Sequence, residues 1–536
     1  MVKKTGKGLA AVLCAFCILQ APNGRAAGRQ KQASHGAKGS VGTVEFRVTC
    51  TAAAQKFFTK GVALLHSFTY EESAEAFRRA AAQDPRCAMA HWGLGMTEYH
   101  QLWEPNAGPE ELKRGAAGIQ KARELKPATP RERDYVEALG VFYDGWEQRS
   151  HEARAQAYRG AMQRVRERNP KDQEAAIFYA LALIATAPAE DKTYANQLKA
   201  AAILEPIFAA HPYHPGVAHY LIHAYDNRAL AREGVPAARA YSKIAPDLPH
   251  ALHMPSHIFT RLGLWEDSIA SNIASVSAAR KHNDKGEEFH ALDYLVYAYL
   301  QVGRNGEAEK IRNSLPPPGD GRPSAPFKIN YARAAIRARC ALEQQHWTEA
   351  ANLAPDPGVQ PQVAAISYWA AALGAAHTEN LQAARQHVEQ LRMIAGDLRK
   401  TGEEYWADQV TIQTQEAAAW LAFEEHRISD AVRMLELAAD HEDDAEKHAV
   451  TPGAIRPARE LLGDLLMELR LPKEALAAYQ KVLDAAPERR NAAKGAAEAA
   501  RVMAMSRQIK EIDGIHLLTE QWTKDMVPPL AEGAGR

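Results

Sequence analysis

Histidine is the residue whose number and spacing could support chemistry in this sequence. Nine of the 21 histidines in the 536-residue chain lie between His211 and His290, where an even distribution would place about three. Two pairs are separated by three residues, in the segments His219-Tyr-Leu-Ile-His223 and His253-Met-Pro-Ser-His257. Because residues four apart share one face of a helix, each pair predicts two imidazoles directed towards the same point.

Three kinds of role fit such a cluster, and the sequence leaves all three open. Imidazole nitrogens bind Zn, Cu, Ni and Fe, and for a site of Zn or another divalent transition metal we predict the ligands His219, His223, His253, His257 and Asp293. For recognition of a peptide or an anionic ligand we predict His250, His290, Tyr297, Trp92 and Tyr99. In the third role the imidazoles only form hydrogen bonds between helices.

Established catalytic motifs are missing from the sequence. Neither histidine pair matches the zinc-protease pattern His-Glu-x-x-His, and there is no phosphate loop, Gly-x-Ser-x-Gly motif or dinucleotide fingerprint. The carboxylates near enough in sequence to act as a base are Glu98, Asp226 and Asp293, with Glu446 added if its loop folds inward. We therefore expect a binding scaffold rather than an enzyme, with a metal-dependent hydrolase or a metallochaperone as the alternative.

The elements that must position these side chains are predicted to be paired helices. From Phe57 onwards, large and small residues recur at the offsets of a 34-residue helix-turn-helix unit, namely Phe57, Gly61, Leu64, Tyr70, Phe77, Ala80 and Pro85. The same offsets return at Leu462, Gly463, Leu466, Ala475, Tyr479 and Pro487. On these residues the chain resembles the tetratricopeptide-repeat (TPR) superfamily over most of residues 50–525. The resemblance implies an all-α, right-handed superhelical solenoid of antiparallel helix pairs.

The repeat register places the histidines on one wall of this solenoid. In TPR units, positions 2, 5 and 9 of the first helix face the inner groove, and Pro212, Pro246 and Gly303 set the register of three successive units. The nine positions hold Gly216, His219, His223, His250, His253, His257, His290, Asp293 and Tyr297. Since packed helices lie about 8–10 Å apart, we expect the six imidazoles to face one shared concave groove.

The N-terminus has the pattern of a secretory signal. Lys3, Lys4 and Lys7 precede an apolar run from Leu9 to Leu19, and small residues follow through Ala27. The segments 58–65, 84–95 and 250–265 also resemble a set of exported, uncharacterised bacterial TPR proteins. That resemblance implies an extracytoplasmic location and transfers no catalytic residue. We expect a periplasmic or secreted protein.

Export would place Cys50 and Cys87 in an oxidising compartment, where disulfides form and persist. The register places Cys50 before the first helix of the first unit and Cys87 after its second helix. Antiparallel paired helices begin and end on the same side, so we predict that these cysteines are bonded, with two unrelated buried thiols as the alternative. Cys340 lies in an apolar helical run and is expected to be a small buried residue.

Domain boundaries follow from proline and glycine. Residues 315–326 are too rich in proline to be helical and separate two blocks. The predicted segments are a signal peptide (1–27), a linker (28–44), an N-terminal block with the histidine-rich groove (45–315), a joint (316–326), a C-terminal block (327–528) and a tail (529–536).

Composition limits the partners. The 65 basic and 65 acidic residues argue against nucleic-acid binding, which needs a basic surface. After the first twenty residues, no apolar run comes near the length of a membrane span, which is about 18 residues. A protein or peptide partner is expected, and the oligomeric state is left open.

Overall fold

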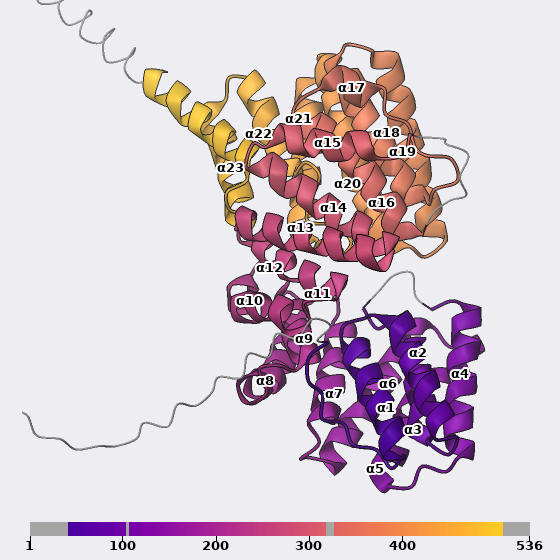
Figure 1. The fold of residues 1–536 in the computed structure, drawn as a ribbon. Coiled ribbons are helices and arrows are strands. Elements are labelled where there is room, and N and C mark those ends of the chain that lie inside the picture. Colours follow the sequence, from indigo (N-terminus) through magenta and orange to yellow (C-terminus); the bar gives the residue numbers. More distant parts are fainter. Residues whose placement is uncertain (1–40, 103–106, 318–325, 507–536) are drawn as a thin grey trace, which may run out of the picture. The chain divides into compact units, whose positions relative to one another are not determined.

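The computed structural model describes residues 41–102, 107–317 and 326–506, and every regular element in these ranges is a helix. Consecutive helices pack side by side, as in the pairs α1 with α2, α5 with α6 and α18 with α19 (Figure 1). Alternate helices also touch, for example α1 with α3 and α18 with α20. The predicted all-α solenoid of helix pairs is therefore confirmed.

The helices before the proline-rich joint carry ten of the 21 histidines, including the six predicted for the groove. They are α1 (Ala52–His66), α2 (Tyr70–Gln83), α3 (Ala88–Thr97), α4 (Pro109–Glu124), α5 (Pro130–Tyr143), α6 (His151–Arg168), α7 (Gln173–Ala185), α8 (Ala195–Ala210), α9 (Pro215–Tyr225), α10 (Val235–Ile244), α11 (Pro249–His253), α12 (Pro255–Arg261), α13 (Trp265–His282), α14 (Lys285–Gln301) and α15 (Asn305–Ser314). Two short 3₁₀ helices, η1 (Trp146–Gln148) and η2 (Ala231–Gly234), lie between them.

The helices after the joint continue the same architecture. They are α16 (Phe327–Glu343), α17 (Trp347–Ala351), α18 (Pro361–His377), α19 (Leu381–Lys400), α20 (Glu404–Glu424), α21 (Ile428–Asp444), α22 (Ala458–Glu468) and α23 (Pro472–Ala485). Residues 490–506 are also helical.

An aromatic ring held between two glycines shows why the repeat pattern folds this way. A Cβ atom added to Gly61 or Gly93 would lie 2.7 or 2.4 Å from the ring of Phe77. At the other end, a Cβ atom on Gly463 or Gly495 would lie 2.6 or 2.3 Å from the ring of Tyr479. Helices can approach so closely only where the side chain is a hydrogen atom. The helices around residues 61–93 and 463–495 are thus built from the same packing unit.

The segment before α1 is tied to the helices without forming a strand. Phe46 is 1% exposed, and its ring packs against Phe58 and Trp92 at centroid distances of 5.3 and 5.6 Å. The predicted disulfide between Cys50 and Cys87 is present and joins the residues just before α1 and α3. Cys340 is buried in α16, as expected.

The two blocks meet directly. Helix α14 packs on α16, although the joint separates them in sequence; residues 318–325 of the joint lie outside the described ranges, as do the signal peptide, most of the linker and the tail. The irregular segment that contains Glu446 begins at Ala445, because α21 continues through Asp444.

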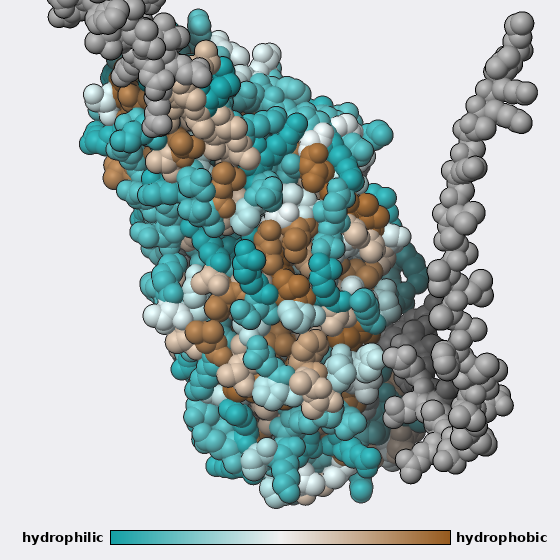
Figure 2. Space-filling view, turned by 90° about the vertical axis from the view of Figure 1, so that its left-hand side faces the viewer, coloured by the Kyte–Doolittle hydropathy of each residue, from teal (hydrophilic) through white to brown (hydrophobic). Residues whose placement is uncertain are grey.

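The apolar side chains lie mainly in the interior. On the face shown in Figure 2, hydrophobic residues form small groups between hydrophilic ones. Within residues 41–102, 107–317 and 326–506, no helix combines the length and apolarity needed to span a bilayer.

Candidate metal centre

Four helices bring the six predicted imidazoles together. His219 and His223 lie one turn apart on α9, which starts at Pro215, where a missing N–H costs nothing. His250 and His253 lie on α11, and His257 follows on α12 after a break at Pro255. His290 lies on α14. The side chains form two groups of three, and in each group one ligand atom per residue lies within 4.8 Å of the others.

The first histidine group consists of His219, His223 and His250. The Nδ1 atom of His219 donates to the backbone carbonyl of His66 at 2.7 Å, so its Nε2 atom carries the lone pair. This Nε2 atom lies 3.1 Å from the Nε2 atoms of both His223 and His250.

Glu287 orients His250 in this group. Its carboxylate lies 3.3 Å from the Nδ1 atom of His250 and 2.6 Å from the Nζ atom of Lys328. Burial opposes ionisation of Glu287, but the charges of Lys328 and His250 hold its pKa well below the usual value. The ionised carboxylate accepts a hydrogen bond from the Nδ1–H group of His250. The Nε2 atom of the same ring is thereby directed towards His219.

The second histidine group consists of His253, His257 and His290. The Nδ1 atom of His253 donates to Oδ1 of Asn272 at 2.8 Å, and the amide nitrogen of Asn272 donates to the carbonyl of Ser268 at 2.8 Å, which fixes the orientation of the amide. The Nδ1 atom of His257 donates to Oδ2 of Asp226 at 2.8 Å. The Nε2 atoms of His253 and His257 face each other at 3.1 Å.

Asp226 is held in its charged form. Burial opposes its ionisation, yet the charges of Lys447 and Arg261 keep its pKa well below the usual value. Lys447 Nζ and Arg261 Nε donate to its two oxygens at 2.8 and 2.9 Å. This carboxylate therefore orients His257 as the outer partner of a metal-bound imidazole does.

Five of these imidazoles are neutral at neutral pH and keep a lone pair. Burial, followed by the charge of neighbouring histidines, lowers the pKa of His219, His223, His253 and His290 well below the ordinary value. Burial also lowers the pKa of His257 to about 4, although Asp226 opposes the shift. Neutral imidazole is the form that binds metal.

The two groups adjoin each other and are enclosed. The rings of His223 and His257 are 6.5 Å apart, and His250 and His253 share helix α11. All six imidazoles are buried except that of His223, which is partly exposed. The imidazoles therefore come together in two enclosed groups, and the expectation that all six face one shared open groove is wrong. Phe68 packs on His219 at 4.4 Å, and Tyr294, beside His257, donates to the carbonyl of Thr451 in the 445–457 segment.

The other predicted site residues lie elsewhere. Asp293 belongs to neither histidine group, because it accepts from Arg339 Nε at 2.9 Å and both side chains are fully buried. Trp92 and Tyr99 are 1% and 2% exposed in the N-terminal core, where Tyr99 stacks on Phe142. The hydroxyl of Tyr297 accepts from Arg489 at 3.2 Å. None of these four residues belongs to the histidine groups.

A third group, His66, Glu174 and His214, was not expected from the sequence. Glu174 accepts from both imidazoles at 2.9 Å, and the second nitrogen of His66 lies 2.9 Å from the hydroxyl of Tyr220. The second nitrogen of His214 accepts from the backbone N–H of Val217. With each nitrogen engaged, this group is a hydrogen-bonded link between α1, α7 and α9.

Sequence reasoning also missed the residues that orient the ligands. Glu287 lies on helix α14 and Asn272 on helix α13. Each is a buried polar residue on a helix face that is otherwise buried, and this pattern is all that the sequence offers to identify them. Asp226 was named as a possible base, whereas here it holds His257.

Comparisons with known proteins give structural matches alone. No family model and no curated protein matches the chain. Among solved structures, the TPR domain of P58(IPK) is 13% identical, with a TM-score of 0.23, covering 85% of this chain and 99% of that one. Naa15/Naa10 bound to HypK-THB gives 11% identity and a TM-score of 0.24, covering 80% and 62%.

The human IFIT1 dimer with m7Gppp-AAAA is 12% identical, with a TM-score of 0.35, covering 78% of this chain and 90% of that one. Similarity at these values says nothing of a shared ligand, partner or activity.

Proposed function

We propose that this helical-repeat protein binds two transition-metal ions, Zn(II) or Cu(II), one in each histidine group. The observation that carries the proposal is the orientation of the imidazoles. His219, His250, His253 and His257 each direct Nδ1 at an oxygen acceptor, which leaves the Nε2 lone pairs pointing at one another.

The distances between these nitrogen atoms suit a bound ion. Two facing lone pairs 3.1 Å apart repel each other unless a proton or a cation lies between them. Two nitrogens bound at about 2.05 Å to one tetrahedral Zn(II) lie about 3.3 Å from each other. An ion in each group would satisfy the lone pairs with little movement of the helices.

Burial favours an ion over a peptide as the ligand. Imidazoles that are almost fully enclosed cannot contact an extended chain, whereas a single ion needs only a narrow path. Three protein nitrogens leave one tetrahedral position open, which is compatible with metal transfer or with a bound water molecule. The half-buried His223 is the most accessible ligand of the first group.

The test is metal stoichiometry on full-length, untagged protein. After treatment with a chelator and addition of Zn(II) or Cu(II), we expect two equivalents per chain by elemental analysis. His219→Ala and His253→Ala should each lose one equivalent, and the double variant should lose both. Co(II) in place of Zn(II) should give the intense visible absorption of a tetrahedral site.

A surface histidine provides the matched control. His346 is half exposed and far from α9 in the chain, so His346→Ala should retain both equivalents. Folding of each variant is checked by its far-UV circular dichroism. Wild-type protein that takes up no metal, or a double variant that still binds two ions, would overturn the proposal.

We also propose that the protein acts outside the cytoplasm. The disulfide between Cys50 and Cys87 supports this location, because such bonds persist in oxidising compartments. Fractionation of the source cells, with the intact disulfide measured by thiol labelling, tests it.

A further inference from the structure

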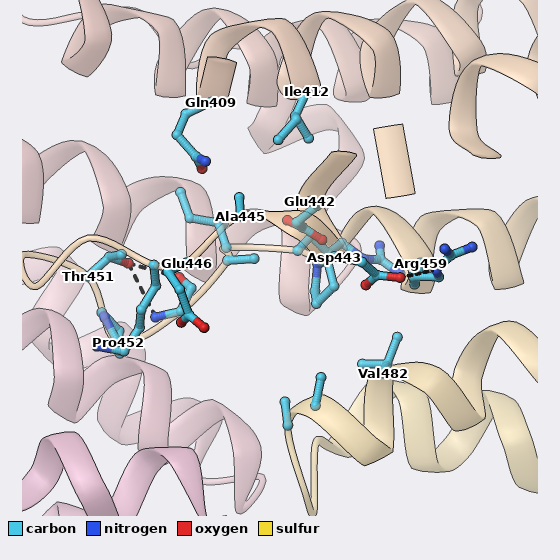
Figure 3. A pocket seen from close by; sticks show the side chains of 18 of the residues that line it. Gln409, Ile412, Glu442, Asp443, Ala445, Glu446, Thr451, Pro452, Arg459 and Val482 are labelled. Carbon is cyan, nitrogen blue, oxygen red and sulfur yellow. Dashed lines mark hydrogen bonds and ion pairs between the residues drawn. The ribbon is translucent and has the colours of Figure 1, made fainter. Parts of the chain in front are cut away.

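A cavity is lined mainly by the helices that follow the joint. Its volume is about 160 Å³. Pockets that hold drug-sized ligands have volumes of about 300 Å³ or more, so this cavity suits a smaller ligand. Helices α16, α18, α20, α21, α22 and α23 and the 445–457 segment form most of its wall, and residues of α12, α14 and the loop at Arg228 complete it. Figure 3 shows Gln409 of α20, Glu442 of α21 and Val482 of α23 around the open space.

The basic side chains of the wall are nearly all neutralised by acidic partners. The pairs are Arg228 with Asp443, Arg261 with Asp226 and Glu446, Lys447 with Asp226, Arg456 with Glu460 and Asp464, and Arg459 with Asp440 and Asp443. Lys481 is exposed to solvent. Little positive charge is therefore left over for an anionic ligand.

Two carboxyl groups of the same wall have no such partner. Neither Glu416 nor Glu442 forms an ion pair within the described residues; Glu442 accepts only from the backbone N–H of Ala458, at 2.8 Å. Glu416 is 2% exposed and lines the cavity. Burial and the nearby Glu442 raise the pKa of Glu416 well above its usual value, and burial raises that of Glu442 to about 7.

Aromatic rings complete the lining beside these carboxyl groups. Tyr331, Trp369, Tyr405 and Trp406 all contribute to the wall. The negative faces of aromatic rings attract organic cations, above all when the site is shielded from water. The charge of Arg456 favours the ionised form of Glu416, and the charge of Arg228 favours that of Glu442, but neither outweighs burial. A bound cation would add the positive charge that ionises both groups.

We propose that this cavity binds a small organic cation, an ammonium compound of a few carbon atoms, between the aromatic rings and the carboxyl groups of Glu416 and Glu442. The rings would pack on the alkyl groups while the carboxylates neutralise the charge. The six histidines do not line this cavity, although Arg261 and Lys447 of its wall also hold Asp226 beside His257. The proposal does not depend on bound metal.

Calorimetric titration of the full-length protein tests the proposal. The probes are choline, 1,4-diaminobutane and 3,3-dimethyl-1-butanol, which has the shape of choline without its charge. We expect at least one cation to bind, and the neutral analogue to bind at least about tenfold more weakly. The preferred cation then distinguishes a quaternary from a primary ammonium ligand.

Variants locate the site. Glu416→Gln and Glu442→Gln should each weaken binding of the cation by about tenfold or more, whereas Glu436→Gln, an exposed position on the same helix as Glu442, should leave it unchanged. Equal binding of choline and its neutral analogue would overturn the proposal, as would the absence of binding by both cations. The comparison of these probes needs only wild-type protein, so misfolding of a variant does not affect it.

Discussion

The Nε2 atoms of His253 and His257 lie 3.1 Å apart, and the Nδ1 atom of each ring donates to an oxygen on another element. Two neutral imidazoles that were free to rotate would turn so that an N–H group of one donates to a nitrogen atom of the other. Here Asn272 and Asp226 hold both rings with their lone pairs facing. The same relationship recurs between His219 and His250. This repetition on successive helices is the arrangement on which the proposal of one ion in each histidine group rests.

Asp226 should control metal affinity without being a ligand. Asp226→Asn keeps the shape of the side chain but removes the charge that orients His257, and we expect Zn(II) affinity of the second histidine group to fall by about 10–100-fold. Competition with a chromophoric chelator measures the change. Asp267→Asn, at an exposed position, is the control, and equal affinities in the two variants would contradict the role given to Asp226.

Gly216 should be essential for packing α1 against α9. A Cβ atom there would lie 2.5 Å from the Nδ1 atom of the buried His66, so Gly216→Ala should lower the free energy of unfolding by about 1–3 kcal/mol. Gly306 has no atom within 4 Å of its Cβ position on α15, so Gly306→Ala should be neutral or stabilising by up to about 1 kcal/mol. Denaturant unfolding of both variants compares them, and equal effects would exclude the close contact as the cause.

His377 should make the protein less stable as the pH falls. Its ring stacks on Trp347 at 3.8 Å and contacts Trp420 at a tilt, at 4.2 Å. Burial, with the charge of Arg456, lowers its pKa from 6.5 to about 3. Between pH 6.5 and about pH 3, this histidine binds a proton in the unfolded chain but not in the folded chain. The free energy of unfolding therefore decreases as the pH falls below 6.5. The contribution of this residue is about 2 kcal/mol between pH 7 and pH 5.

His377→Phe preserves the stacking and removes the titration. The free energy of unfolding of this variant should therefore change less between pH 7 and pH 5 than that of the wild-type protein. His346→Gln, at the surface, is the control. Identical slopes for His377→Phe and the wild-type protein would contradict the prediction.

The disulfide should stabilise the first helix pair. Cys50 and Cys87 are separated by 37 residues, and closing a loop of this length stabilises the folded state by about 3–4 kcal/mol in the chain-entropy model. We expect Cys50→Ser with Cys87→Ser to lower the free energy of unfolding by this amount. Reductant should lower the free energy of unfolding of the wild-type protein by the same amount and leave that of the double variant unchanged. If reductant destabilises both proteins equally, this role of the disulfide is wrong.

Much of the fold follows from the sequence because its signals are local. Gly61, Phe77 and Gly93 repeat the spacing of Gly463, Tyr479 and Gly495, and a glycine opposite a ring specifies where two helices cross. The helical spacing of His219 with His223 likewise determines that both rings share a face. The helix pairs and the convergence of the imidazoles could therefore be predicted from one chain.

The partners of those imidazoles were decided by the tertiary structure alone. The carbonyl that orients His219 belongs to His66, 153 positions earlier, and Asp226 meets Lys447 across 221 positions. Asp293 fits the histidine register but forms its ion pair with Arg339, because a buried carboxylate is stabilised most by the nearest buried cation. Helical periodicity specifies which way a side chain points. Which distant helix it meets depends on how the whole array closes, and no local pattern contains that information.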